Sequence, residues 1–195
     1  PDSPHTFALT CNGIQSNLAV GSPVQFGEVL VGASATLDVA LGNAGTADLH
    51  LASTQIAAGP FTAPDLQGIV ITPGAAVEMP VTFTPSAADA GTDVHGTLVV
   101  TFDGGETRAV ELIGPARDAT LSLTPGGTID FGTVCAGQSR EQIFVALNTG
   151  SGAVDLTSAQ VSGPGFALTL IAPTSVPAPL PARGGGSVSF RVTAM

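Results

Sequence analysis

The sequence predicts an all-β protein built from antiparallel β-sandwiches. Three observations support this fold class: apolar residues alternate with polar ones along short segments, turn residues separate the segments, and one long pattern occurs twice. The chain has 195 residues, including 25 Gly and 15 Pro, and 44% of its residues are hydrophobic. This composition suits many short strands joined by tight turns. No segment shows a sustained helical period.

The repeated pattern begins with FGEVLVG at residues 26–32 and returns 105 residues later as FGTVCAG at 131–137. The match extends beyond these seven residues, because the pair Asn43 and Gly45 returns as Asn148 and Gly150 at the same spacing. A repeat of about 100 residues indicates two units of one architecture. We therefore expect an N-terminal strand at residues 1–13, a first repeat at 14–117 and a second repeat at 118–195.

Several segments read as half-buried strands because their apolar residues recur with a period of two. In the first repeat we expect Leu37, Val39 and Leu41 on one buried face. Their counterparts are read one residue out of step with the rest of the repeat, as Ile143, Val145 and Leu147. The segment TLVVTFDGGETRAVEL predicts a hairpin that turns at DGGE, where glycines accept positive φ.

The order of the motifs resembles a known family. FGxVxxG is followed by a strand ending in LGNAG, then by LHL, GPF, ITPG, VTFTP and GTLVVTF. This order resembles the ASH or hydin-type immunoglobulin-like repeat, and bacterial surface proteins of the choice-of-anchor D type carry similar repeats. The resemblance covers residues 23–116 fully and 128–195 in part. It implies two tandem immunoglobulin-like antiparallel β-sandwiches, and binding or scaffolding rather than catalysis.

The second repeat is expected to lack its final strands. Residues 187–195 (SVSFRVTAM) correspond to AVEMPVTFT of the first repeat, and no later segment corresponds to the hairpin. An unfinished sandwich exposes core surface and unpaired strand edges. Three interpretations stay open: the chain is a segment of a longer array, the second repeat closes on itself, or a neighbouring copy donates a strand.

Donor-strand exchange makes the most specific prediction of the three. The donor would be residues 5–12, with Phe7, Leu9 and Cys11 facing the neighbour's groove. A head-to-tail contact that does not close builds a filament.

The two cysteines take part in this interpretation. Cys135 stands where the first repeat has Leu30, and Cys11 stands at about the place of Ile113 at the end of the first repeat. First and last strands of such sandwiches can lie side by side. If strands are exchanged, we expect a Cys11–Cys135 disulfide between subunits, whereas in a segment of a longer array each cysteine has lost its partner. Two free thiols in a reducing compartment are the alternative.

Composition argues against several other functions. The net charge is −10, from 15 acidic residues against five Arg and no Lys, and such a surface repels nucleic acid. No apolar segment is long enough to span a membrane. The three His and two Cys show no metal-ligand spacing, and no catalytic motif stands out, so we expect no metal, no cofactor and no enzyme activity.

The sequence therefore predicts a structural repeat subunit of an extracellular or bacterial cell-surface assembly, including a filament, whose signal peptide is removed or lies outside this segment. Its partners would be other copies of itself or adjacent repeats of the same chain. Two alternatives stay open: an intracellular ASH-type adaptor that binds a protein partner, and a non-catalytic module of a larger protein.

Overall fold

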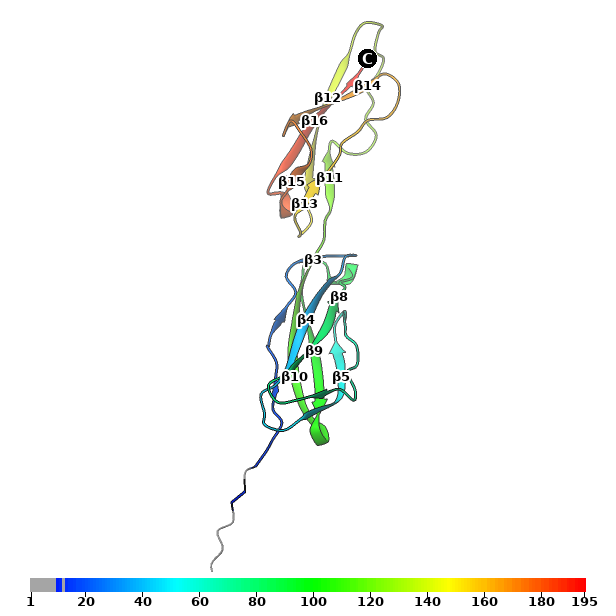
Figure 1. Ribbon diagram of the computed structural model, residues 1–195. Coiled ribbons are helices and arrows are strands. Elements are labelled where there is room, and N and C mark those ends of the chain that lie inside the picture. The colour runs from blue at the N-terminus through cyan, green and yellow to red at the C-terminus, as the bar shows by residue number, and fades with distance from the viewer. Residues whose placement is uncertain (1–9, 12) are drawn as a thin grey trace, which may run out of the picture. The chain divides into compact units, whose positions relative to one another are not determined.

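The computed structural model describes residues 10, 11 and 13–195. These residues form β-strands and three short 3-10 turns, without an α-helix among them. The strands of the first repeat are β1 (Leu18–Ala19), β2 (Val24–Gln25), β3 (Val29–Leu30), β4 (Ala35–Asn43), β5 (Leu49–Ala58), β6 (Phe61–Thr62), β7 (Val70–Ile71), β8 (Ala76–Phe83), β9 (Asp93–Phe102) and β10 (Glu106–Arg117). Those of the second repeat are β11 (Leu121–Thr124), β12 (Arg140–Asn148), β13 (Val154–Leu156), β14 (Phe166–Ala172), β15 (Ala178–Leu180) and β16 (Ser187–Ala194). Figure 1 labels most of these strands.

The first repeat is built from two main sheets. One has the strand order β1-β4-β8-β6, and the other has the order β2-β10-β9-β5-β7, with β3 also paired to β10. The predicted hairpin is present: β9 and β10 are neighbours, and Gly104 and Gly105 between them have φ of 74° and 104°. Along β9, Leu98, Val100 and Phe102 are buried, as the period of two predicts.

The segment FGEVLVG runs parallel to the last strand of its repeat. Leu112 of β10 pairs with Val24 of β2, and Ala116 of β10 pairs with Val29 of β3. The heptapeptide is thus an edge segment, whose strand character depends on a partner from the far end of the repeat.

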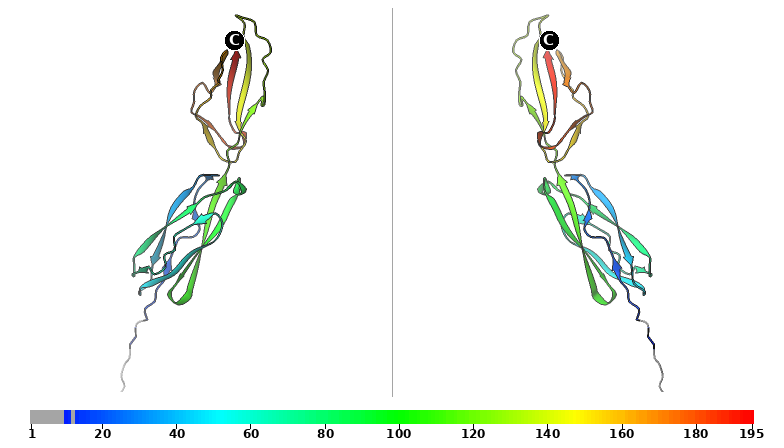
Figure 2. Two further views of the ribbon diagram at one scale, coloured as in Figure 1. Left: turned by 90° about the vertical axis from the view of Figure 1, so that its right-hand side faces the viewer. Right: turned by 90° about the vertical axis from the view of Figure 1, so that its left-hand side faces the viewer.

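The second repeat reproduces one of the two sheets. Its four-stranded sheet has the order β11-β12-β16-β14, which repeats β1-β4-β8-β6 strand for strand. Its remaining strands, β13 and β15, form a two-stranded sheet that corresponds to β5 and β7. Within the described residues after 118, no strand corresponds to β9 or β10. Figure 2 shows the strands of the second repeat from two sides, in colours from yellow-green to red.

The predicted faces of β12 are wrong by one residue. Ala146 and Asn148 are buried as Leu41 and Asn43 are, so the 105-residue spacing holds throughout this strand. Ile143, predicted to face the core, is 49% exposed. Successive side chains of a strand point to opposite faces, so a one-residue error in phase reverses the whole strand.

The chain separates into two compact units that do not follow the predicted repeat boundaries. One comprises the described residues up to Gln25 with Thr36–Thr82 and His95–Ile113, and the other comprises Phe26–Ala35, Phe83–Val94 and Gly114–Met195. The strands β8, β9 and β10 thus contribute to both units. The domain boundaries at 13/14 and 117/118 stay predictions.

Candidate functional site

In the first repeat the two sheets bury the side chains between them. Leu41 on β4, Val81 on β8, Val100 on β9 and Leu112 on β10 are each fully buried. Each side chain packs against the opposite sheet, which is the usual arrangement of a β-sandwich core. This repeat is therefore the reference for what the second repeat would bury if its second sheet were complete.

In the second repeat the corresponding face is partly uncovered. Leu121 and Leu123 of β11 are 51% and 45% exposed, and Phe166 of β14 is 41% exposed. All three lie on the inner face, because they pair with the buried residues Asn148, Ala146 and Ala194. Leu18, which pairs with Asn43 as Leu121 pairs with Asn148, is only 1% exposed. The missing strands account for this difference.

The small sheet β13–β15 covers one end of this inner face. There Ala146, Ala178, Leu180 and Val188 form a buried cluster, with Phe190 packed against it. Beside the cluster lies an apolar hollow of about 250 Å³, whose lining includes Leu121, Leu123, Leu156, Leu168 and Phe190. We call this hollow, together with the exposed inner side chains Leu121, Leu123 and Phe166, the open face.

Two backbone segments beside the open face have lost the strands that pair with their counterparts. Residues 128–135, which include FGTVC, are not in a strand, whereas their counterparts in β2 and β3 pair with β10. Residues 157–161 are also not in a strand, whereas residues 53–58 of β5 pair with β9. A strand needs a partner for its N–H and C=O groups. Without counterparts of β9 and β10, the two sequences cannot adopt the structure of their first-repeat equivalents.

The segment 128–135 is held by local contacts instead. The Arg140 guanidinium donates to the carbonyl oxygen of Phe131 over 3.3 Å, and the Gly132 N–H donates to Asp130 Oδ1 over 2.7 Å. The Phe131 ring meets the Phe166 ring edge-on, with centroids 5.7 Å apart. These few contacts leave the backbone of the segment open to a new partner strand.

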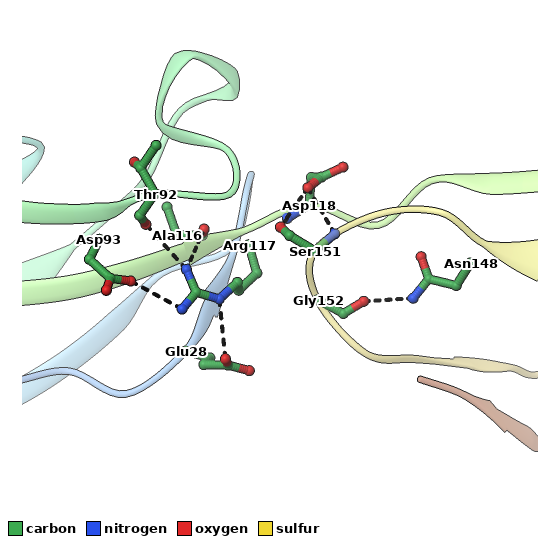
Figure 3. A network of polar contacts seen from close by, with 9 residues as sticks. All are labelled: Glu28, Thr92, Asp93, Ala116, Arg117, Asp118, Asn148, Ser151 and Gly152. Carbon is green, nitrogen blue, oxygen red and sulfur yellow. Dashed lines mark hydrogen bonds and ion pairs between the residues drawn. The ribbon is translucent and has the colours of Figure 1, made fainter. Parts of the chain in front are cut away.

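A buried asparagine fixes the loop after β4 in the first repeat and after β12 in the second. Asn148 Nδ2 donates to the carbonyl oxygens of Gly152 (2.6 Å) and Leu180 (3.1 Å), and its Oδ1 accepts from the Gly150 N–H (3.0 Å). Asn43 makes the same three bonds, to Ala47, Ile71 and Gly45. Figure 3 shows Asn148 with Gly152. The sequence displayed both Asn-x-Gly pairs, but it did not show that the amide joins three backbone segments.

Asp118 provides the second polar anchor of this loop. Its Oδ1 accepts from Ser151 Oγ at 2.6 Å and from the Ser151 N–H at 3.0 Å (Figure 3). The hydrogen bond from the Ser151 hydroxyl holds the pKa of Asp118 below its ordinary value, and the Ser151 backbone N–H acts in the same direction. The pair ties the beginning of the second repeat to the loop that Asn148 organises.

With this geometry in view, comparison with known proteins defines the family. The family model of the ASH domain, described as abnormal spindle-like microcephaly-associated, ASPM-SPD-2-Hydin, matches residues 14–109. The matched residues make up just under half of the chain. The match agrees with the all-β fold and with the resemblance drawn from the motif order, and it covers β1 to β9 and the beginning of β10. The second repeat lies outside it.

Similar solved structures include proteins from distant sources. A protein of unknown function from Porphyromonas gingivalis W83 has a TM-score of 0.40 and 16% identity, with 91% of this chain and 82% of that chain covered. The secreted serine protease VesC of Vibrio cholerae has a TM-score of 0.41 and 14% identity, with 91% of this chain and 46% of that chain covered. The ASH / PapD-like domain 7 of human CEP192 has a TM-score of 0.40 and 15% identity, with 58% of this chain and 97% of that chain covered. No curated protein matches the sequence.

The predicted donor residues all lie before residue 14, where the match to the ASH family model begins. Phe7 and Leu9 lie outside the described residues. Thr10, Cys11 and Gly13 are described and are not in a strand. Cys11 and Cys135 are both exposed and are not bonded to each other within one chain. A bond between subunits stays a prediction.

The open face combines exposed apolar side chains with backbone that is not in a strand. Apolar side chains are uncovered there, and the backbone of 128–135 and 157–161 is free of strand partners. Within the described residues, no group of three His, Cys, Asp or Glu could hold a metal ion, and no helix is long and apolar enough to cross a membrane. The ASH family, whose model matches residues 14–109, consists in general of non-catalytic binding or structural modules.

Proposed function

We propose that this chain is a structural repeat subunit of an extracellular or bacterial cell-surface assembly, arranged as two tandem immunoglobulin-like sandwiches. In the proposal the second sandwich is completed by β-strands from outside residues 118–195. The location follows from the resemblance to bacterial surface repeats. The assembly follows from the open face.

One observation carries the proposal: the uncovered inner face lies beside two segments that lack strand partners. Leu121 and Leu123 expose about half of their surface where Leu18 is buried. Apolar burial contributes roughly 25 cal/mol per Å², so covering these side chains favours association. Added strands would also pair the backbone of residues 129–135 and 157–161. A filament follows if the strands come from a second copy, because the contact is then head-to-tail.

The proposal is tested by the size of the native chain in solution. Sedimentation and light scattering across a wide range of concentrations are expected to show species growing in steps of one chain, 19.2 kDa each. Electron micrographs of the concentrated sample are expected to show linear particles. An unboiled denaturing gel is expected to show the same ladder, collapsing on heating. Monomers at every concentration would contradict assembly from these chains alone.

A further inference from the structure

The N-terminal segment of the chain can be placed in register with the strand that the second repeat lacks. Leu18 pairs with Asn43, and Leu121 pairs with Asn148, so β1 and β11 correspond residue by residue. Two close approaches support this correspondence. A Cβ on Gly45 would lie 2.3 Å from the carbonyl oxygen of Gln15, and one on Gly150 would lie 2.4 Å from that of Asp118.

Counting back in step from β1 and β11 aligns the N-terminal segment with β10. The aligned pairs are Phe7 with Val110, Ala8 with Glu111, Leu9 with Leu112, Cys11 with Gly114 and Ile14 with Arg117. Val110 and Leu112 are fully buried in the first repeat, whereas Glu111 is exposed. The N-terminal segment therefore carries large apolar residues at the inward positions of β10 and Ala8 at an outward one.

In the aligned pair Cys11 and Gly114, the N-terminal segment has the larger residue. The residue that faces this position is smaller in the second repeat than in the first. A Cβ on Gly114 would lie 2.5 Å from the Phe83 ring, so only glycine fits beside that ring. Phe83 is the last residue of β8, and Ala194 is the last residue of the corresponding strand β16. Ala194 leaves room for a side chain that Phe83 excludes, and Cys11 supplies one. The segment thus fits the second repeat and not the first.

We propose that residues 5–13 of a second copy of this chain add to the second repeat in the place that β10 has in the first, parallel to residues 129–134, with Phe7 and Leu9 facing the core and Cys11 against Ala194. The inference rests on the proposed function and specifies its donor segment and register. The parallel direction follows from the first repeat, where β10 runs parallel to β2 and β3.

The register has a consequence for the cysteines. Leu30, the counterpart of Cys135, pairs with Arg117, whose counterpart is Ile14. Cys11 stands three residues before Ile14, a separation of about 10 Å along a strand. A disulfide needs Cα atoms within about 7 Å. In this register Cys11 and Cys135 do not bond, whereas a cysteine at position 14 would meet Cys135. The predicted Cys11–Cys135 bond and this register therefore make opposite predictions.

A compensating pair of substitutions tests the contact between Cys11 and Ala194. Ala194→Phe restores the ring that excludes a side chain, and is expected to weaken self-association about tenfold or more. Adding Cys11→Gly to this variant rebuilds the Gly114–Phe83 combination and is expected to recover association to within about threefold of the parent. Sedimentation velocity of the full-length chain gives the association constants. Loss of association without recovery in the double variant would overturn the contact.

A matched pair of charge substitutions tests which side of the donor strand faces the core. Leu9→Asp places a carboxylate at an inward position and is expected to abolish association, because an unpaired charge is costly to bury. Ala8→Asp places it at the outward neighbour and is expected to leave association within about threefold of the parent. Equal effects of the two variants would overturn the inward and outward assignment.

Disulfide trapping distinguishes the register from the proposed function itself. In the associated state, Ile14→Cys with Cys11→Ser is expected to form a bond between subunits with Cys135, and the parent chain is expected to form none between Cys11 and Cys135. A Cys11–Cys135 bond in the parent would overturn the register and leave the assembly standing. If none of these variants alters association, residues 5–13 are not the donor segment, and the proposed assembly itself still stands. If the chain stays monomeric at every concentration, a second copy is not what covers the open face.

Discussion

Asn43 and Asn148 occupy equivalent positions at the ends of β4 and β12, and both are buried. Each amide donates twice and accepts from the glycine two residues later, and Asn43 also accepts from the Asn17 N–H over 3.3 Å. These bonds join the loop of each asparagine to a segment far along the chain. A buried polar group is stable only when it is hydrogen-bonded, and removing one partner leaves the others without compensation. The Asn-x-Gly pair is therefore part of the repeat architecture.

Asn148→Ala is expected to lower the free energy of unfolding by about 1–3 kcal/mol, because two buried carbonyl groups and one N–H lose their partner. Urea unfolding followed by circular dichroism measures this change. Gln160→Ala, at an exposed position, is the control and is expected to change it by less than about 0.5 kcal/mol. An Asn148→Ala variant as stable as this control would contradict the structural role.

The Asp118–Ser151 pair makes part of the stability depend on acid pH. The pKa of Asp118 is lowered in the folded chain by the bond from Ser151, so its contribution is present above the unfolded value of about 3.9. The contribution is lost as pH falls through the folded pKa, because protonation then weakens the bond. Ser151→Ala is expected to raise the pKa of Asp118 in a carboxyl NMR titration.

The same substitution is expected to lower stability more at about pH 6 than at about pH 2, because protonation of Asp118 as pH falls weakens its bond to Ser151. Urea unfolding at both pH values measures the difference. Ser162→Ala, which removes an exposed hydroxyl, serves as the control. An Asp118 pKa that does not move in Ser151→Ala would contradict the assigned cause.

Among the elements, β12 shows what periodicity alone cannot decide. Its sequence REQIFVALN contains apolar residues in both phases, so alternation does not identify the inward face. The pairing decides it: Phe144 lies opposite Phe190, and the two rings stack with centroids 5.5 Å apart. Ile143, on the other face, lies opposite Arg191. Contacts across the sheet, rather than the sequence of the strand, set its phase.

Phe144→Ala is expected to lower the free energy of unfolding by about 2 kcal/mol, less than for a fully buried Phe because the ring is only half-buried. Ile143→Ser, at the adjacent exposed position, is expected to cost under about 0.5 kcal/mol. Thermal and urea unfolding of the two variants give the comparison. The phase predicted from the sequence alone requires the reverse order of effects.

For the whole molecule, the decisive feature is the absence of counterparts of β9 and β10 within residues 118–195. That one absence explains the exposed Leu121 and Leu123, the irregular 128–135 segment and the short β13. Sheet edges with unpaired backbone groups are sites of association in many proteins. Among the described residues, the second repeat therefore has a sheet edge without a strand partner.

Amide hydrogen exchange is expected to report this arrangement directly. In the monomer, residues 157–161 are expected to exchange fast, whereas residues 53–58, which pair with β9, exchange slowly. On association the amides of 129–134 are expected to become protected, because they then pair with the donor strand. Mass spectrometry of the chain at low and high concentration measures both. Equal protection of 53–58 and 157–161 in the monomer would contradict the open edge.

The sequence determined the class of the fold, the repeat and most of the strand faces of the first repeat. It did so because alternation along a strand and glycine in a turn are local properties, written in neighbouring residues. It also indicated that the second repeat lacks its last strands, since a missing motif is visible by comparison with the first. Asn43 and Asn148 are equally visible in the sequence, but their neighbouring residues do not reveal the hydrogen bonds that the two side chains make.

Only the tertiary structure decided which segments become strands and which faces turn inward. FGEVLVG and FGTVCAG are nearly the same sequence, yet only the first contributes a strand, because only the first has β10 beside it. Ile143 and Phe144 are both apolar, yet only Phe144 stacks on a partner across the sheet. In a β-sheet the hydrogen-bond partner lies on another strand, so the outcome for one segment depends on residues far away in the chain.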